Sequence, residues 1–236
     1  MLAGNPVLKS IVEEGIAVNS TASIDFSADK PQVLGNPTEG ALLLWLYDKG
    51  VDYRRLKENV KVLAEVPFST ERKHMATLVE SGVEKGKKIL YVKGAPEIVL
   101  GMCRDVVGNT GRKEIEAQLL AYQSKAMRTL GFAYQVVDDG DKAIEDNKVC
   151  ADRLTFIGVA AISDPVRADV PAAVKECIDA GIAIKIVTGD TPATAKEIAR
   201  QIGLWTDTDT DNAIITGPEF AALTDSELLR RVEGIK

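Results

Sequence analysis

Long apolar runs are missing from this sequence, and their absence excludes a membrane-spanning segment. The longest apolar stretches cover residues 41–46 and 157–162, whereas a spanning helix needs about 20 mostly apolar residues. The first four residues have neither the basic start nor the apolar stretch of a signal peptide. We therefore expect this piece of protein to be soluble and not to insert into a membrane.

Cysteine and histidine are scarce. The three cysteines, Cys103, Cys150 and Cys177, are odd in number and lack the spacing of metal ligands, which favours reduced thiols in a cytosolic setting. His74 is the only histidine, and one histidine cannot form a metal cluster. We expect neither a disulfide framework nor a histidine-based metal site, and we assign no catalytic base to His74.

An excess of positive charge is also missing. The chain has 29 Lys and Arg residues against 35 Asp and Glu residues, with a net charge of -6 and an isoelectric point near 5.0. This balance argues against a dedicated nucleic-acid binder. What is present, 45% hydrophobic and 27% charged residues, is ordinary for a soluble globular protein. The length of 236 residues suits one large domain or two modest ones.

The first part of the chain mixes helix and strand patterns. Residues 36–39 look like a helix start, with Asn36 or Thr38 as the cap, and Gly50 is a suitable stop. A helical pattern also covers residues 112–127. Aliphatic and aromatic runs separated by turn signals predict antiparallel strands at residues 61–68, 75–79, 88–92 and 132–137. Among the first 35 residues we note short β-like runs, such as residues 15–18.

The pattern changes after about residue 155. Apolar strands and helices alternate there, at residues 156–162, 170–180, 182–187 and 191–202. A βαβα order with fully apolar strands is typical of a parallel sheet covered on both faces. We place a domain change near residue 160, with Asp164-Pro165 as the hinge.

Lys93-Gly94-Ala95-Pro96-Glu97 is the most informative segment, because it follows a strand and opens a helix. Gly94 allows close backbone approach, and Pro96 suits a first helical turn. A lysine held at such a junction is well placed for an anionic ligand. The alternative is a lysine that only contacts water.

Two further segments lie in the second part. Thr188-Gly189-Asp190 follows a predicted parallel strand, where a hydroxyl, a backbone N–H and a carboxylate could hold a phosphoryl group and hydrated Mg²⁺. A capped helix explains the same residues equally well. Asp164-Pro165-Val166-Arg167 suits a joint between domains, with Arg167 able to meet a phosphate or a carboxylate. By itself this segment is more simply a surface turn.

Other candidates lie in the first part. The loop after the strand at residues 61–68 combines Phe68, Lys73 and Met75, which could stack a base and hold phosphates, although a charged turn is the commoner explanation. Arg128, predicted at the end of the long helix, either complements the helix dipole or reaches a phosphate. Glu39 is favourable in a first helical turn and could also accept from an adenine amino group or orient Lys73.

In combination these segments resemble P-type cation ATPases, whose motifs occur in the same order. The matching segments are Asn36-Pro37-Thr38-Glu39, Phe68-Ser69 with Arg72-Lys73-His74-Met75, Lys93-Gly94-Ala95-Pro96-Glu97, Arg128, Asp164-Pro165-Val166-Arg167 and Thr188-Gly189-Asp190. The look of residues 36–44 and 93–103, including Cys103, favours the calcium-pump branch. The resemblance covers essentially the whole chain.

The resemblance implies a mixed α/β, or α+β, architecture. Residues 1–160 would form the nucleotide-binding domain, a twisted antiparallel sheet with flanking helices. Residues 161–236 would form part of the phosphorylation domain, a partial parallel βαβα segment of haloacid-dehalogenase-like fold. The implied partners are ATP, Mg²⁺ and the transmembrane, actuator and remaining phosphorylation parts of a pump on the cytoplasmic face of a membrane.

The resemblance also implies roles for the candidate residues. In the nucleotide pocket Phe68 stacks on adenine with Met75 nearby, Glu39 and Lys73 lie around the base, Lys93 and Gly94 line the floor, and Arg128 reaches the phosphates. In the second part the transferred phosphoryl group and its Mg²⁺ would contact Thr188, Gly189 and Asp190.

The sequence departs from the family pattern in ways that limit its own activity. It contains no Asp-Lys-Thr-Gly-Thr and no Gly-Asp-Gly-x-Asn-Asp segment, and Thr70 stands where relatives often have arginine. We therefore expect weak nucleotide binding and no phosphoenzyme from this chain alone, the parent pump being the enzyme. Two alternatives are a soluble haloacid-dehalogenase-like phosphatase and a non-catalytic docking domain.

Overall fold

The computed structural model describes residues 5–28, 30–108, 110–125, 127–163, 166–189 and 192–236. The chain divides into two compact units, which are described separately. The first unit holds residues up to 119 together with residues 129–162. The second unit holds residues 120–128 and residues from 163 onward. Within the described residues no helix is both long and apolar enough to cross a bilayer.

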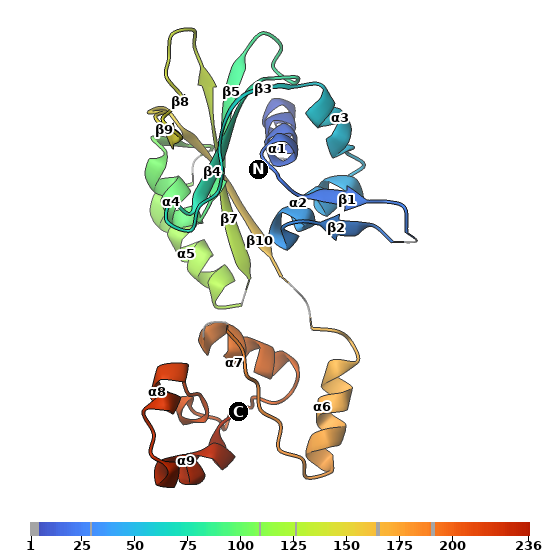
Figure 1. Cartoon of the computed structure of the whole chain (residues 1–236), viewed down its shortest axis with the longest axis vertical. Coiled ribbons are helices and arrows are strands. Elements are labelled where there is room, and N and C mark those ends of the chain that lie inside the picture. The colour runs from blue at the N-terminus through green and yellow to red at the C-terminus, as the bar shows by residue number, and fades with distance from the viewer. Residues whose placement is uncertain (1–4, 29, 109, 126, 164–165, 190–191) are drawn as a thin grey trace. The chain divides into compact units, whose positions relative to one another are not determined.

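A six-stranded sheet is the centre of the first unit (Figure 1). Its strands, in spatial order, are β3 (Lys61–Val66), β4 (His74–Glu80), β5 (Lys88–Gly94), β7 (Arg128–Val137), β10 (Thr155–Ile162) and β6 (Asp105–Val106). The pairs β3–β4, β4–β5 and β5–β7 are antiparallel, whereas β10 and β6 are parallel. The sheet is therefore mostly antiparallel, as the hairpin signals predicted.

Helices cover both faces of this sheet (Figure 1). On one face lie α1 (Pro6–Val18), α2 (Pro37–Asp48) and α3 (Tyr53–Glu58), together with the small hairpin of β1 (Ser23–Asp25) and β2 (Gln32–Leu34). On the other face lie α4 (Pro96–Met102), α5 (Arg112–Gln123) and the hairpin of β8 (Ile144–Glu145) and β9 (Lys148–Val149). Apolar side chains fill the space on each face, for example Leu43 and Leu46 on one and Leu90 and Phe156 on the other.

Cap chemistry at the start of α2 explains why this helix begins where the sequence predicts. The Asn36 side chain accepts hydrogen bonds from the backbone N–H groups of Thr38 and Glu39, and Pro37 occupies the first turn. Gly50 follows the helix with a φ of 74°, a conformation that glycine adopts without strain. The predicted helix start and stop are both confirmed.

The predictions for residues 15–18 and for Arg128 are wrong. Residues 15–18, noted as β-like, form the end of helix α1, because Asn5 caps the helix and apolar residues recur with helical spacing at Leu8, Ile11 and Gly15. Arg128 begins strand β7 and does not end a helix, since α5 already ends at Gln123. In both places a local pattern was ambiguous and tertiary packing decided the structure.

The second unit is helical in its described residues. It contains α6 (Val170–Asp179), α7 (Pro192–Gln201), α8 (Gly217–Ala221), α9 (Asp225–Arg231) and the 3₁₀ turns η2 (Asp211–Ala213) and η3 (Val232–Gly234). A small core gathers Val174, Ala199, Ile202, Trp205 and Ala213. The helices predicted at residues 170–180 and 191–202 are thus present as α6 and α7.

Of the two predicted parallel strands, the first is present but belongs to another sheet, and the second is absent. Residues 156–162 belong to β10 in the sheet of the first unit, and residues 182–187 are extended but form no strand. Ladder pairing is the reason, because a strand exists only beside a hydrogen-bonded neighbour. In the second half of this extended segment the Ile186 N–H donates to the Lys236 carbonyl at 2.7 Å, which is too little to build a ladder.

Candidate functional site

A buried ion pair marks the end of strand β5. The Lys93 Nζ lies 2.7 Å from Oε1 of Glu39, which comes from the first turn of α2. Only 3% of Lys93 and 6% of Glu39 is exposed. The sequence motifs indicate both residues but predict no contact between them; the structure brings them together.

The Glu39 carboxylate receives further hydrogen bonds from the connection between α1 and β1. Its Oε2 accepts from the Thr21 hydroxyl at 2.7 Å, from the Thr21 N–H at 2.8 Å and from the Ala22 N–H at 3.1 Å. The Lys93 ammonium also donates to the Ser20 hydroxyl at 3.1 Å. One carboxylate and one ammonium therefore join α2, β5 and the α1–β1 connection.

The electrostatics of the pair follow from its burial and its partners. Burial opposes the charge on Glu39, but attraction to Lys93 and the hydrogen bonds from Lys93 and Thr21 outweigh it, so that its pKa lies below the ordinary value. Burial lowers the pKa of Lys93, and the neighbouring Glu39 offsets part of this shift. The contacts with Lys93 and Thr21 therefore stabilise the charged form of the Glu39 carboxylate.

Lys57 adds a second ammonium group beside the pair. This lysine lies on α3 and donates to the Ser20 carbonyl at 2.9 Å. Burial lowers its pKa, while Glu39 acts in the opposite direction. The segment Ser20–Ala22 is therefore held by Lys57 at its carbonyl, by Lys93 at a hydroxyl and by Glu39 at two N–H groups.

Gly94 is required by close packing against the start of β4. A Cβ added here would lie 2.3 Å from the Lys73 carbonyl oxygen and 2.6 Å from the Cα of His74. The same carbonyl accepts from the Ala95 N–H at 2.9 Å. The predicted close approach is confirmed, and it joins the Lys93 segment to the loop that carries Phe68 and Lys73.

The loop between β3 and β4 presents an aromatic ring and cations to solvent. Phe68 is 58% exposed, and Lys73 is exposed with a φ of 56°. Arg72 donates to the Pro67 carbonyl, and its buried Nε has no hydrogen-bond partner. Among the residues that the structure describes, no acidic side chain forms an ion pair with Lys73 or Arg72.

Met75 lies close to this loop, whereas Arg128 does not lie beside Lys93. Met75 is buried and directly opposite Lys93 in the β4–β5 ladder, and Phe132 flanks Lys93 on the other side. Residues directly opposite each other project from the same face of a sheet. Arg128 is exposed and belongs to the second unit by its contacts, so the structure gives it no place beside Lys93.

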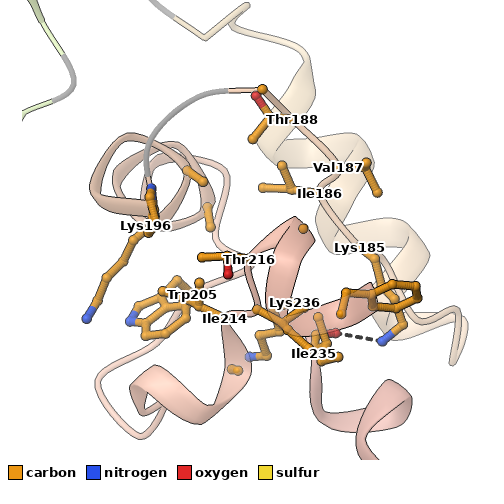
Figure 2. A pocket seen from close by; sticks show the side chains of 18 of the residues that line it. Lys185, Ile186, Val187, Thr188, Lys196, Trp205, Ile214, Thr216, Ile235 and Lys236 are labelled. Atoms are coloured by element: carbon orange, nitrogen blue, oxygen red, sulfur yellow. Dashed lines mark hydrogen bonds between the residues drawn. The ribbon is translucent and has the colours of Figure 1, made fainter. Parts of the chain in front are cut away.

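Thr188 and Gly189 line a cavity of about 570 Å³ in the second unit (Figure 2). Apolar side chains such as Ile186, Ile214 and Trp205 form much of its wall. In Figure 2 the side chains of Ile186 and Val187 point to opposite sides of the extended segment, and Lys185 Nζ donates to the Ile235 carbonyl at 2.6 Å. The Lys196 Nζ lies over the Trp205 ring, 4.7 Å from the ring centroid.

Several predicted residues give no site geometry. Asp164, Pro165 and Asp190 lie outside the described residues. Arg167 is exposed, and its Nε lies 3.7 Å from a carboxylate oxygen of Asp169. Among the described residues no group of three or more His, Cys, Asp or Glu side chains gathers that could hold a metal ion.

Ser20, Thr21 and Lys57 are site residues that the sequence motifs do not predict. The polar run Asn19-Ser20-Thr21 directly after an apolar helix is a signal for a capped connection, but it does not reveal a distant partner. Lys57 offers no signal, because its helix carries several similar basic residues.

Comparison with known proteins decides the family. The family model described as P-type ATPase, cytoplasmic domain N, matches residues 7–169. The chain belongs to this family. The matched region contains the six-stranded sheet, the Phe68 loop and the Glu39–Lys93 pair of the N domain.

Curated relatives of this P-type ATPase chain carry calcium in their names. The chain is 35% identical over 230 residues to the calcium-transporting ATPase PAT1 of Dictyostelium discoideum, covering 94% of this chain and 20% of the relative. It is 33% identical to the plasma membrane-type calcium-transporting ATPase 7 of Oryza sativa subsp. japonica, covering 94% and 23%. It is 35% identical to the calcium-transporting ATPase 1 of Lactococcus lactis, covering 86% and 23%. The chain therefore spans about a fifth of the length of these relatives.

Proposed function

We propose that this chain binds ATP as the nucleotide-binding part of a calcium-transporting P-type ATPase. The strongest support is the combination of family membership with the loop between β3 and β4, which carries the exposed Phe68 ring and two cations that pair with no acid among the described residues. An open aromatic face and free positive charge are what a base and its phosphates require.

The candidate nucleotide-binding residues have distinct roles in this proposal. Phe68 stacks on the adenine ring, and Met75 supplies apolar contact below it. Lys73 and Arg72 attract the phosphates, and Arg128 adds a further cation. Gly94 allows the Lys93 segment, which is the proposed floor of the pocket, to pack closely against the loop that carries Phe68 and Lys73.

We further propose that residues from about 161 onward are part of a phosphorylation domain of haloacid-dehalogenase-like fold. Thr188 and Gly189, with Asp190, then face the γ-phosphoryl group through a hydroxyl and a backbone N–H. The aspartate that accepts this group belongs to another part of the pump. Mg²⁺ would bind to the phosphates of the nucleotide. Asp164, Pro165 and Arg167 form the hinge.

In the parent pump the reaction breaks the bond between the β-bridging oxygen and the γ-phosphorus of ATP. The aspartate carboxylate forms a new bond to that phosphorus, ADP leaves, and water later hydrolyses the acyl phosphate. Transport of Ca²⁺ by the membrane part, with the present chain on the cytoplasmic face, completes the proposal. The names of the relatives support calcium as the ion.

Nucleotide titration tests the binding role. His74, the only histidine, begins β4 opposite Gly94 and gives a single imidazole signal for NMR. ATP at millimolar concentration should shift this signal, and no shift would refute the proposal. Phe68→Ala should weaken ATP binding by about 1–3 kcal/mol, because base–aromatic stacking contributes that much.

A matched variant controls for unspecific effects of removing an aromatic ring. Tyr47 is also exposed but lies in the last turn of α2, so Tyr47→Ala should leave the dissociation constant of ATP unchanged. Isothermal titration of both variants measures the difference. Equal effects of the two substitutions would remove Phe68 from the site.

A further inference from the structure

The first unit has a cavity at the end of the sheet where a turn joins β4 to β5. Its volume is about 730 Å³, which is a usual size for a ligand site. The end of α3, the start of β3 and the β4–β5 turn form its walls. Four lysines and two glutamates line it, namely Lys61, Lys85, Lys87, Lys88, Glu58 and Glu80. The cavity is therefore basic, although the whole chain has a net charge of -6.

Buried hydrogen bonds fix the β4–β5 turn that forms one wall. The Glu14 carboxylate of α1 is 1% exposed and accepts from the Ser81 hydroxyl at 2.7 Å. It also accepts from the backbone N–H groups of Gly82 at 2.8 Å and Val83 at 3.0 Å. The Ser81 hydroxyl accepts in turn from the Glu84 N–H at 2.9 Å. This wall is ordered without a ligand, which lowers the entropic cost of binding one.

Close packing joins this wall to the end of α3. A Cβ added to Gly82 would lie 2.9 Å from the carbonyl oxygen of Asn59, the residue that follows the helix. Within the turn the Lys87 N–H donates to the Glu84 carbonyl at 3.0 Å, and Lys85 lies between these two residues. The backbone thus holds the lysines of the turn at the cavity.

The lysines around the cavity are only weakly engaged by acids. Among the described residues Lys85 forms no ion pair. The other three pair with acids at 2.7 to 3.3 Å, namely Lys61 with Glu80, Lys87 with Glu84 and Lys88 with Asp139. The lysine side chains in these pairs are between 40% and 71% exposed. Exposed pairs contribute little because water screens them, so an anion with several charges can compete for these lysines.

The cavity is separate from the proposed nucleotide pocket. Glu80 lies opposite Lys88 at one end of the β4–β5 ladder, and His74 lies opposite Gly94 at the other end. Six residue steps of about 3.3 Å put roughly 20 Å between the two ends. A small ligand in the cavity therefore does not contact the Phe68 loop, and the two sites can be tested separately.

We propose that this cavity binds a small anion that carries two or more phosphate groups. Lys85 supplies the unpaired ammonium group, and the other three lysines add positive charge around it. Phosphate suits such a site because a lysine ammonium is a point charge that binds phosphate oxygens without the planar geometry that arginine imposes. More than one phosphate is needed because Glu80, Glu84 and Asp139 compete with the ligand for the lysines. The inference does not depend on the proposed ATP binding.

Titration with pyrophosphate at low ionic strength tests the inference by NMR. The amide signal of Gly86, which lines the cavity, should shift and saturate at millimolar pyrophosphate. Lys85→Gln should raise the dissociation constant about two- to fivefold, the range of an exposed ion pair, and Lys85→Glu should abolish the shift. Lys148 is also exposed but lies on β9, so Lys148→Glu is the matched control and should leave the shift unchanged.

Three results would overturn the inference. The first is an unshifted Gly86 signal in the wild-type chain. The second is a Gly86 shift that persists in Lys85→Glu or disappears equally in Lys148→Glu, because the anion would then respond only to overall charge. The third is a shift of the His74 signal alone, which would place pyrophosphate at the other end of β4.

Vesicles distinguish a lipid headgroup from a soluble ligand of the same chemistry. Phosphatidylcholine vesicles with and without phosphatidylinositol bisphosphate are sedimented with the chain. Sedimentation that requires the bisphosphate and is lost in Lys85→Glu would identify a lipid headgroup in the cavity. A Gly86 shift with pyrophosphate, without vesicle binding that depends on Lys85, would identify a soluble phosphate compound. Either result supports the cavity as a phosphate site.

Discussion

The two units of the chain differ in how they treat polar groups. In the first unit buried carboxylates accept several hydrogen bonds: Glu14 accepts from the hydroxyls of Ser81 and Tyr91 at 2.7 Å and from the N–H groups of Gly82 and Val83. The Glu39–Lys93 pair is satisfied in the same way. Such networks specify one arrangement of helices and sheet, because any other arrangement leaves a buried charge without a partner.

The second unit has surface charges and a small apolar core. Its ion pairs involve exposed or half-buried side chains, as in Lys175 with Asp179 and Lys196 with Asp211. Val187 is 97% exposed in the extended segment, although it is aliphatic. The comparison teaches that the first unit is defined by its internal contacts, whereas the second presents apolar and strand-like surface that its own described residues do not cover.

The largest effect is expected from Lys93→Met. The substitution leaves the buried Glu39 carboxylate without its counterion and should lower the free energy of unfolding of the first unit by about 3–5 kcal/mol. The second unit should be unaffected. Trp45 and Trp205, the two tryptophans, report the two units separately by fluorescence when the other is replaced by Phe.

The double variant Lys93→Met with Glu39→Gln is the control for this prediction. It removes both charges and should recover part of the lost stability, which a double-mutant cycle measures. A loss below about 1 kcal/mol for Lys93→Met would mean that the pair resembles a surface ion pair, and the contrast between the units would disappear.

A smaller effect is expected from acid. The pKa of Glu39 lies below its ordinary value of 4.5, because Lys93 and Thr21 stabilise the carboxylate against the cost of burial. Its contribution is therefore present above pH 4.5 and lost as the pH falls through the lower folded-state pKa. Glu39→Gln should flatten the decline in stability of the first unit below pH 4.5, read from Trp45.

The corresponding group in the second unit is Asp209. Hydrogen bonds from Lys236 and Thr206 lower its pKa from 3.8 to about 2, so its contribution is lost between these pH values. Asp209→Asn should change only the Trp205 signal, in that window. An effect of either substitution on the reporter of the other unit would show that the units do not unfold independently.

The smallest effect is expected from Lys175→Ala. Lys175 forms an exposed pair with Asp179 one helical turn away, at 2.6 Å. Exposed pairs of this kind contribute about 0.3–0.5 kcal/mol. Urea unfolding followed by Trp205 should show a change within that range, and a loss above about 1 kcal/mol would mean that surface charges hold the second unit together.

Features that depend on neighbouring residues could be predicted from the sequence. The Asn36 cap, the Gly50 stop and the strands before Gly94 follow from cap chemistry, glycine conformation and aliphatic composition. The β-like run at residues 15–18 was misjudged, because a short apolar run fits a helix end as well as a strand. The strand predicted at residues 182–187 is absent for a different reason, since composition cannot supply a pairing partner.

Several residues of the candidate site could likewise be predicted from local motifs. Glu39, Phe68, Lys73, Met75 and Lys93 were chosen from motifs, and the structure places them at helix starts, strand ends and the loop between β3 and β4. Cys103, noted as a family feature, is buried, and burial raises the pKa of its thiol to about 12.

By itself, the sequence determined which segments are helix caps, hairpin strands and candidate phosphate-binding motifs, because these features depend on residues a few positions apart. Only the tertiary structure decided that Lys93 pairs with Glu39 and that Thr21 and Lys57 hold them. These groups are distant in the chain, and their contact depends on the register of β5 beside β4 and on the packing of α1, α2 and α3 against one face of the sheet. Burial then forces the charges to pair, because no water remains to solvate them.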